Sequence, residues 1–98
     1  MPLCGGLGEA LPATPEIQEL CDKVKAQAEA KSGKTFSQFI ALSYKTQVVA
    51  GKNLFIKIDA GDIFPHVRVY QALPHTNKGP EVHSVQLDQS KDAEIVYF

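Results

Sequence analysis

Net charge, cysteine and long apolar runs are all scarce in this sequence of 98 residues. Ten Lys and Arg residues stand against eleven Asp and Glu residues, so the formal net charge is −1. Nucleic-acid-binding domains usually carry a basic surplus, and polybasic segments are attracted to anionic membranes. Residues 39–42 form an apolar run far shorter than a membrane span, and the first residues lack the features of a secretory signal. We therefore expect no nucleic-acid partner, no membrane partner and no signal peptide.

The two cysteines and three histidines form no recognisable site. Cys4 and Cys21 are too few for the disulfide framework of a small secreted domain, which favours a cytosolic protein with reduced thiols. His66, His75 and His83 lack metal-site spacing, so we interpret them as unrelated surface residues and expect no metal or other cofactor. The sequence also lacks the glycine-rich nucleotide and nucleophile-elbow motifs. An enzyme built on Cys21 or a histidine is the alternative to a binding protein.

An amphipathic helix is predicted over residues 15–32. Thr14 is a good N-cap, Pro15 suits the first helical position, and Gly33 is a natural residue to follow the last turn. Residues 1–13 show no periodicity and contain several glycines and prolines, so we expect a flexible N-terminal trunk without regular structure. The apolar stripe of the helix consists of Ile17, Leu20, Cys21, Val24 and Ala28.

After residue 33 the apolar pattern changes to a period of two, which is typical of strands. The first strand places Ile40, Leu42 and Tyr44 on one face. Further strand patterns occur at residues 53–59, at residues 66–69, from Val85 to Leu87 and at residues 95–98. The intervening loops are too short for crossover helices, so antiparallel pairing is predicted. We predict one α+β domain over residues 1–98, in which an antiparallel sheet wraps around one long helix.

Residues 46–52 interrupt the first two strands in an unusual way. Hairpin tips usually carry Asn, Asp, Gly or Ser, but this segment contains Val48, Val49 and Ala50 before a single glycine, Gly51. One interpretation is that the strand ends lie elsewhere and the valines are ordinary core residues. The other is an exposed apolar tip that meets a partner.

Two other segments have features of a binding loop. Leu73 and Pro74 form an apolar pair followed by His75, and a proline reduces the entropy that a loop loses when it docks. Gly5 and Gly6 would let the backbone pass close to a partner surface. The alternative for these two glycines is simple flexibility of the trunk.

The segment Gln47-Val48-Val49-Ala50-Gly51 is the hallmark first-hairpin motif of the cystatins. The chain resembles the stefins, the type 1 cystatins, which are the single-domain and disulfide-free branch of that family. Further segments that are similar to stefins, in order, are residues 1–7, 12–19, 44–46, 53, 55–57, 61–62, 67–75 and 97–98. The sequence departs from the stefin pattern at residues 61–66, which are one residue shorter, and at residues 79–82.

The resemblance implies a cystatin-like fold and a reversible, tight-binding, competitive inhibitor of papain-like cysteine proteases, the cathepsins among them. It implies no catalytic residue and no cofactor, and a cytoplasmic location with the nucleus as a further compartment. In that family three segments form a wedge that enters the active-site cleft of the protease. Carried over by match, the protease-binding residues are Leu3, Cys4, Gly5 and Gly6 in the trunk, Gln47, Val48, Val49, Ala50 and Gly51 in the first hairpin, and Leu73, Pro74 and His75 in the second.

The oligomeric state has two interpretations. A monomer is expected for an inhibitor whose wedge must reach a cleft. The apolar tip at Val48 and Val49 could also open and exchange strands between two chains, which would give a domain-swapped dimer. A plain interaction module of that kind is a third hypothesis beside the inhibitor and the enzyme.

Overall fold

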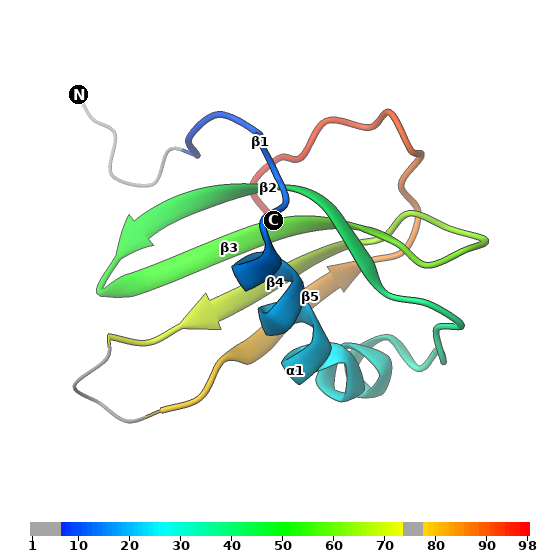
Figure 1. Ribbon diagram of the computed structural model, residues 1–98, viewed down its shortest axis with the longest axis horizontal. Helices are drawn as coiled ribbons and strands as arrows, with labels where there is room; N and C mark the ends of the chain where they lie inside the picture. Colours follow the sequence, from blue (N-terminus) through cyan, green and yellow to red (C-terminus); the bar gives the residue numbers. More distant parts are fainter. Residues whose placement is uncertain (1–6, 74–77) are drawn as a thin grey trace.

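The structure is a computed structural model that describes residues 7–73 and 78–98. One α-helix lies across a five-stranded sheet, as Figure 1 shows, and the strand order β1-β2-β3-β4-β5 follows the chain. Every pair of neighbouring strands is antiparallel. The α+β architecture predicted from the sequence is therefore confirmed. The strands are β1 (Leu11–Pro12), β2 (Ile40–Val49), β3 (Gly51–Asp59), β4 (His66–Gln71) and β5 (Glu81–Gln86).

The helix α1 (Pro15–Ser32) has the bounds that its capping residues predict. The side-chain oxygen of Thr14 accepts a hydrogen bond from the backbone N–H of Ile17 at 3.2 Å, which satisfies a donor in the first turn. Gly33 ends the helix with φ 72°, and its N–H donates to the carbonyl of Glu29. Both ends of α1 therefore depend on interactions within a few residues of the chain.

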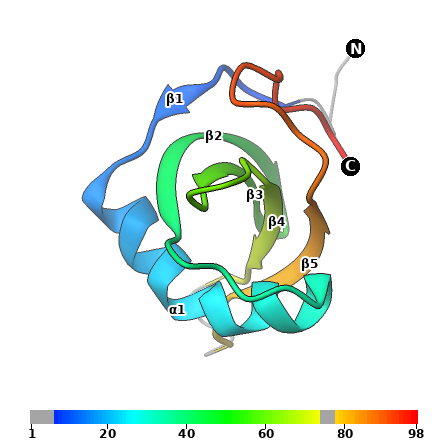
Figure 2. The same cartoon turned by 90° about the vertical axis from the view of Figure 1, so that its right-hand side faces the viewer.

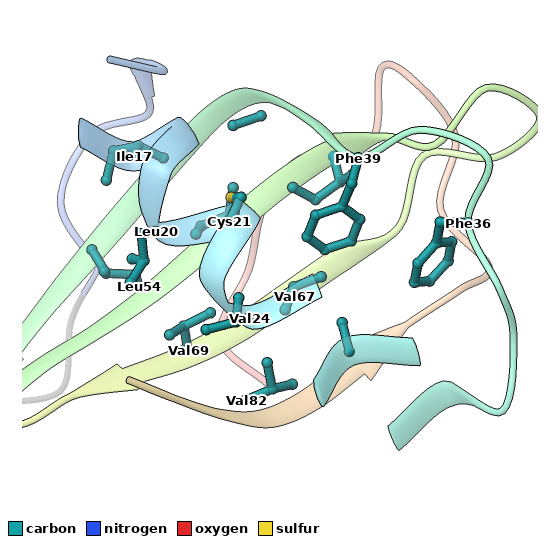
Figure 3. Close-up of a cluster of buried hydrophobic side chains, with 14 of the residues drawn as sticks. Ile17, Leu20, Cys21, Val24, Phe36, Phe39, Leu54, Val67, Val69 and Val82 are labelled. Carbon is teal, nitrogen blue, oxygen red and sulfur yellow. The ribbon is translucent and has the colours of Figure 1, made fainter. Parts of the chain in front are cut away.

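The core lies between α1 and one face of the sheet. All five residues of the predicted helical stripe are buried. Figure 3 labels four of them, Ile17, Leu20, Cys21 and Val24, beside inward side chains of the strands and beside Phe36 and Phe39 from the connection between α1 and β2. Each large side chain buried in this way stabilises the fold by about 1.5–3 kcal/mol relative to its exposed state. The strand residues at the centre of this core are Leu54, Ile56, Ile58, Val67, Val69 and Val82.

The first half of β2 does not follow the predicted alternation. The prediction placed Ile40, Leu42 and Tyr44 on one face, but the register shifts between Ala41 and Ser43. Ala41 is consequently buried in the core, whereas Ile40 is 46% exposed. A bulge adds one residue to a strand. The residues before it therefore point to the opposite face of the sheet from the one that continuous alternation predicts. The prediction for Ile40 was wrong because a bulge leaves no mark in a simple apolar alternation.

The segment after β5 crosses the other face of the sheet without forming a strand, so the strand predicted at residues 95–98 is wrong (Figure 2). Its aromatic side chains pack on the sheet instead. The ring of Phe55, fully buried, lies 5.6 Å from that of Tyr97 and 5.5 Å from that of Phe98. Arg68 adds a hydrogen bond to the main-chain oxygen of Phe98 at 2.8 Å. Side-chain packing therefore holds this segment where the sequence pattern indicated a backbone ladder.

Regular structure also precedes the helix, where none was predicted. Leu11 and Pro12 form the short strand β1, opposite Tyr44 and Ser43 of β2. The N–H of Ala13 continues the contact by donating to the carbonyl of Leu42 at 3.1 Å. A two-residue strand has no alternation to detect, so only the approach of β2 reveals it.

Candidate functional site

The turn between β2 and β3 is apolar and exposed. β2 ends at Val49 and β3 begins at Gly51, so Ala50 alone connects the two strands (Figure 1). Val48 is 75% exposed and Val49 is 44% exposed. Of the two interpretations of this segment, the structure supports the exposed tip, because both valines lie at the end of a strand and outside the core.

A buried hydrogen bond fixes the register of this hairpin. Gln47 and Asn53 lie opposite each other on β2 and β3. The side-chain amide of Asn53 donates to the side-chain oxygen of Gln47 at 2.7 Å, and both residues are only 6% exposed. A slip of one position would break this bond in a buried setting, which is costly. The strand pairing therefore holds Val48 and Val49 at the tip.

Gly51 brings the hairpin close to the neighbouring strand. Its φ is 106°, a conformation that favours glycine. A Cβ at this position would lie 2.6 Å from the carbonyl oxygen of Gln71, which is the last residue of β4. The turn therefore rests directly on the end of β4, and only glycine leaves room for this contact.

The second loop is the connection between β4 and β5, residues 72–80. A groove of about 490 Å³ lies between the tip of the first hairpin and the segments on either side of residues 74–77 in this loop. Leu73, one of the predicted binding residues, lines it and is 40% exposed. Pro74 and His75 lie outside the described residues. Leu73 and the first-hairpin valines, which are far apart in sequence, therefore share one groove. Its lining is Val48, Val49, Gly51 and Lys52 from the hairpin, and Gln71, Ala72, Leu73, Lys78 and Pro80 from the second loop region.

The residues before α1 run toward the same end of the sheet. Leu11 lies opposite Tyr44, and the N–H of Gly8 donates to the carbonyl of Thr46 at 3.1 Å. Followed back from Leu11 to Gly8, the chain thus moves along β2 toward the hairpin tip. The predicted trunk contacts, Leu3, Cys4, Gly5 and Gly6, lie outside the part of the chain that the structure describes.

Cys21 lies in the core and does not line the groove (Figure 3). It is 1% exposed, and burial, together with the negative charge of Asp22, raises the pKa of its thiol to about 12. The thiolate is the nucleophilic form of cysteine, so the Cys21 thiol is unreactive at neutral pH. The buried, structural role predicted for Cys21 is confirmed, and an enzyme built on this residue loses its basis.

His66 corrects the prediction that all three histidines lie on the surface. It is fully buried on β4, between Lys57 of β3 and Gln86 of β5. Burial, with the positive charge of Lys57 as a second cause, lowers the pKa of His66 from 6.5 to about 4. Neither ring nitrogen has a hydrogen-bond partner among the described residues. Alternation with Val67 indicated a solvent-facing side chain, but a tertiary contact covers this position.

Most of the described side chains at the groove are apolar. Among the described residues that line the groove, Lys52 and Lys78 are charged, and none is a cysteine, a histidine or a carboxylate. Elsewhere in residues 7–73 and 78–98, no three His, Cys, Asp or Glu side chains gather as metal ligands would. In the same part of the chain, no helix has the length and apolar character to cross a membrane.

Two residues that shape the hairpin were not predicted from the sequence. Asn53 fixes the register, and an available signal was its polar side chain directly before the apolar run from Leu54 to Ile56. Tyr70 on β4 donates a hydrogen bond from its hydroxyl to the carbonyl of Ala50 at the tip. No sequence signal pointed to Tyr70, because the contact joins residues twenty positions apart on different strands.

Comparison with known proteins identifies the family. The family model of the cystatin domain matches residues 5–92. The chain belongs to the cystatin family. It is 50% identical over 95 residues to human (Homo sapiens) Cystatin-A, covering 96% of this chain and 97% of that protein. It is 48% identical over 97 residues to Cystatin-B of Sus scrofa, covering 98% and 99% of the two chains.

A third relative, Leukocyte cysteine proteinase inhibitor 1 of Sus scrofa, is 47% identical over 97 residues, covering 98% of this chain and 94% of that protein. Similarity of this kind over nearly the whole length places the chain with the stefins, the type 1 cystatins. The family match includes the complete first hairpin, from Gln47 to Gly51. The cystatin family, predicted from that motif, is thereby confirmed.

Proposed function

We propose that this cystatin is a reversible, tight-binding, competitive inhibitor of papain-like cysteine proteases, cathepsins among them. The observation that carries the proposal is the exposed apolar tip at Val48 and Val49, held by a hairpin of fixed register. Membership of the cystatin family supports it, and one relative is named a cysteine proteinase inhibitor. The protein acts by binding, and no catalytic residue of its own is needed.

The physical basis is the fit between an apolar wedge and an apolar cleft. A tip that carries valines displaces water from the protease cleft and gains about 1.5 kcal/mol or more for each valine fully buried. The sheet holds the turn before binding, so little conformational entropy is lost on docking. The turn at Ala50 and Gly51 lies in close contact with β4. This contact keeps the peptide bonds of the turn from adopting the extended form that a protease cleaves. The complex therefore blocks the cleft without being processed.

Three segments contribute to the proposed wedge. The first hairpin supplies Gln47 to Gly51, and Leu73 with Pro74 and His75 supplies the second contact. The trunk residues Leu3, Cys4, Gly5 and Gly6 form the third. The course of residues 8–11 along β2 and the groove that Leu73 shares with Val48 support this grouping. For the location of the protein we propose the cytoplasm, with the nucleus as a further compartment, and for its free state a monomer.

Titration of papain tests the proposal. Wild-type protein should reduce papain activity to zero near one equivalent, activity should return on dilution, and added substrate should raise the apparent inhibition constant. Val48→Lys should raise the inhibition constant at least about tenfold, because it replaces an apolar contact by a charge that the cleft would desolvate.

Val96→Lys is the matched control for this titration. Val96 is also an exposed valine, at 51% exposure, but it lies on the segment after β5. This variant should inhibit papain as the wild type does. Intact protein that leaves papain activity unchanged at micromolar concentration would refute the proposed function.

A further inference from the structure

Tyr70 links the turn of the first hairpin to the adjacent strand. It lies on β4, opposite Asn53 of β3, and its hydroxyl donates a hydrogen bond to the carbonyl oxygen of Ala50. Ala50 is the single residue between β2 and β3. The bond therefore ties the turn itself to β4, in addition to the ladder that joins the strands.

The backbone of the turn meets β4 at the same place. A Cβ on Gly51 would lie 3.0 Å from the Tyr70 hydroxyl and 2.6 Å from the carbonyl oxygen of Gln71. The hydroxyl thus occupies the point where turn and strand are in close contact. The contact with the Gln71 carbonyl oxygen, which does not involve the hydroxyl, shows that the turn lies against β4 at this point.

A neighbouring ring holds the side chain of Tyr70 in place. His83 of β5 stacks on it, with the ring centres 5.5 Å apart and the planes 17° from parallel. The register between β4 and β5 shifts between Arg68 and Val69, and this shift leaves His83 outside the paired positions. Such bulges redirect side chains, and here the redirected ring supports Tyr70.

We propose that Tyr70 is a positioning residue for protease binding, whose hydroxyl keeps the turn at Ala50 bent so that Val48 and Val49 point outward together. The proposal rests on the proposed function, because the hairpin concerned is the one that would enter the cleft. A turn that is already ordered loses less entropy on docking. Loss of the hydroxyl should therefore loosen the turn in the free protein and shorten the lifetime of the complex. One neutral hydrogen bond corresponds to about fivefold in an equilibrium constant.

The variant Tyr70→Phe removes the hydroxyl and keeps the ring and its stacking partner. Dissociation and association rates with papain, and hydrogen exchange of the backbone amides of residues 48–52 in the free protein, are the two readouts. We expect about fivefold faster dissociation, an association rate within twofold of the wild type, and about fivefold faster exchange at the tip. The free energy of unfolding in urea should fall by no more than this same fivefold factor, about 1 kcal/mol, so the variant stays folded during both measurements and a positioning role is separated from unfolding.

Tyr97→Phe is the matched control. Tyr97 is 55% exposed and packs on Phe55, on the face crossed by the segment after β5, and its loss of a hydroxyl should change neither readout. A second pair of variants tests the support from His83. His83→Ala should give part of the Tyr70→Phe effect, and His83→Phe, which restores a ring for stacking, should return both readouts to the wild-type values.

The two proposals fail in different ways. If wild-type protein does not inhibit papain, the proposed function is refuted, while hydrogen exchange in the free protein still decides whether Tyr70 holds the turn. Tyr70→Phe with wild-type exchange at residues 48–52 overturns the positioning role. Wild-type dissociation from papain in this variant overturns it as well, as does an equal effect of Tyr97→Phe.

Discussion

At the scale of single residues, Cys21 and His66 are buried ionisable side chains that their surroundings keep uncharged. Burial raises the pKa of the Cys21 thiol to about 12 and lowers the pKa of His66 to about 4. The cause is the same for both, because transfer of a charge out of water is costly. Neither residue lines the groove of the proposed binding edge. Their roles are therefore structural, and their consequences are changes in stability.

The first prediction concerns the stability of the protein in mild acid. An unfolded His66 takes up a proton below pH 6.5, whereas the folded protein resists protonation down to about pH 4. The contribution of His66 to stability is thus complete above pH 6.5 and is lost as the pH falls toward 4. The loss should reach about 3 kcal/mol at most. Urea unfolding at a series of pH values between 7.5 and 4 measures it.

The variant His66→Leu should lose most of this pH dependence. It should also be at least as stable as the wild type at pH 7, because it removes two buried nitrogens without hydrogen-bond partners among the described residues. His83→Gln, a change at an exposed histidine, should retain the wild-type slope. An unchanged slope in His66→Leu would assign the acid sensitivity to other groups.

The second prediction separates structure from function at Cys21. Cys21→Ser places a hydroxyl in an apolar core, so the free energy of unfolding should fall by about 1–3 kcal/mol. The inhibition constant for papain should not change at temperatures where the variant is folded. Paired urea unfolding and papain titration test both parts. Loss of inhibition by a fully folded variant would contradict a purely structural role for this thiol.

At the scale of the element, the first hairpin combines exposed apolar residues at its tip with contacts that fix its conformation. The hydrogen bond between Asn53 and Gln47 sets the register, and Gly51 lets the turn rest on β4. The tip is therefore rigid although it contributes nothing to the core. Exposed apolar side chains lower the solubility of a protein. A rigid tip that carries them suits a surface that meets a partner.

The third prediction tests the need for glycine at the turn. Gly51→Ala introduces a Cβ 2.6 Å from a backbone oxygen, at a φ of 106°, so the turn must move away from β4. We expect papain inhibition to weaken more than about tenfold and stability to fall by about 1–3 kcal/mol. Gly61→Ala is the control, because Gly61 also has a positive φ, 97°, but does not line the groove, so this variant should lose stability and still inhibit papain as the wild type does. Wild-type inhibition by Gly51→Ala would show that papain binding does not require the close contact between the turn and β4.

At the scale of the whole molecule, the sheet brings separate parts of the chain to one end. The β2–β3 turn and the segments on either side of residues 74–77 lie at that end in Figure 1, and the chain from residue 11 back to residue 8 runs along β2 toward it. The segment after β5 crosses the face of the sheet opposite α1 (Figure 2). A meander of antiparallel strands places alternate connections together, so the first and second hairpins come to the same edge without a crossover. The spacing of the proposed contacts is thus a property of the sheet.

The fourth prediction follows from the exposed turn at Ala50. If the hairpin opens on mild heating, β2 and β3 become one extended segment, and the same strand pairs can form between two chains. Size-exclusion chromatography should then detect a dimer with unchanged far-ultraviolet circular dichroism. This dimer should not inhibit papain, because its wedge has been straightened. A heat-induced dimer with full inhibitory activity would contradict exchange through this hairpin.

The parts of the fold that were predicted correctly are those that depend on near neighbours. The ends of α1 follow from the capping residues Thr14 and Gly33. Its buried stripe follows from apolar residues that recur on one face from each helical turn to the next. The family was evident from Gln47 to Gly51, since those residues are adjacent in sequence. The bulge near Ala41, the burial of His66 and the course of residues 95–98 were missed, because each depends on which strand or segment lies alongside.

The helix, the class of fold and the family could be predicted from the amino-acid sequence, because capping, periodicity and a contiguous motif are local properties. The exposure of Val48 and Val49 could not, because it depends on how the strands pair in the folded protein. The pairing of Gln47 with Asn53, the seat of Gly51 on β4 and the bond from Tyr70 to Ala50 are contacts between strands. Such contacts depend on register and bulges, and these are set by packing over the whole sheet.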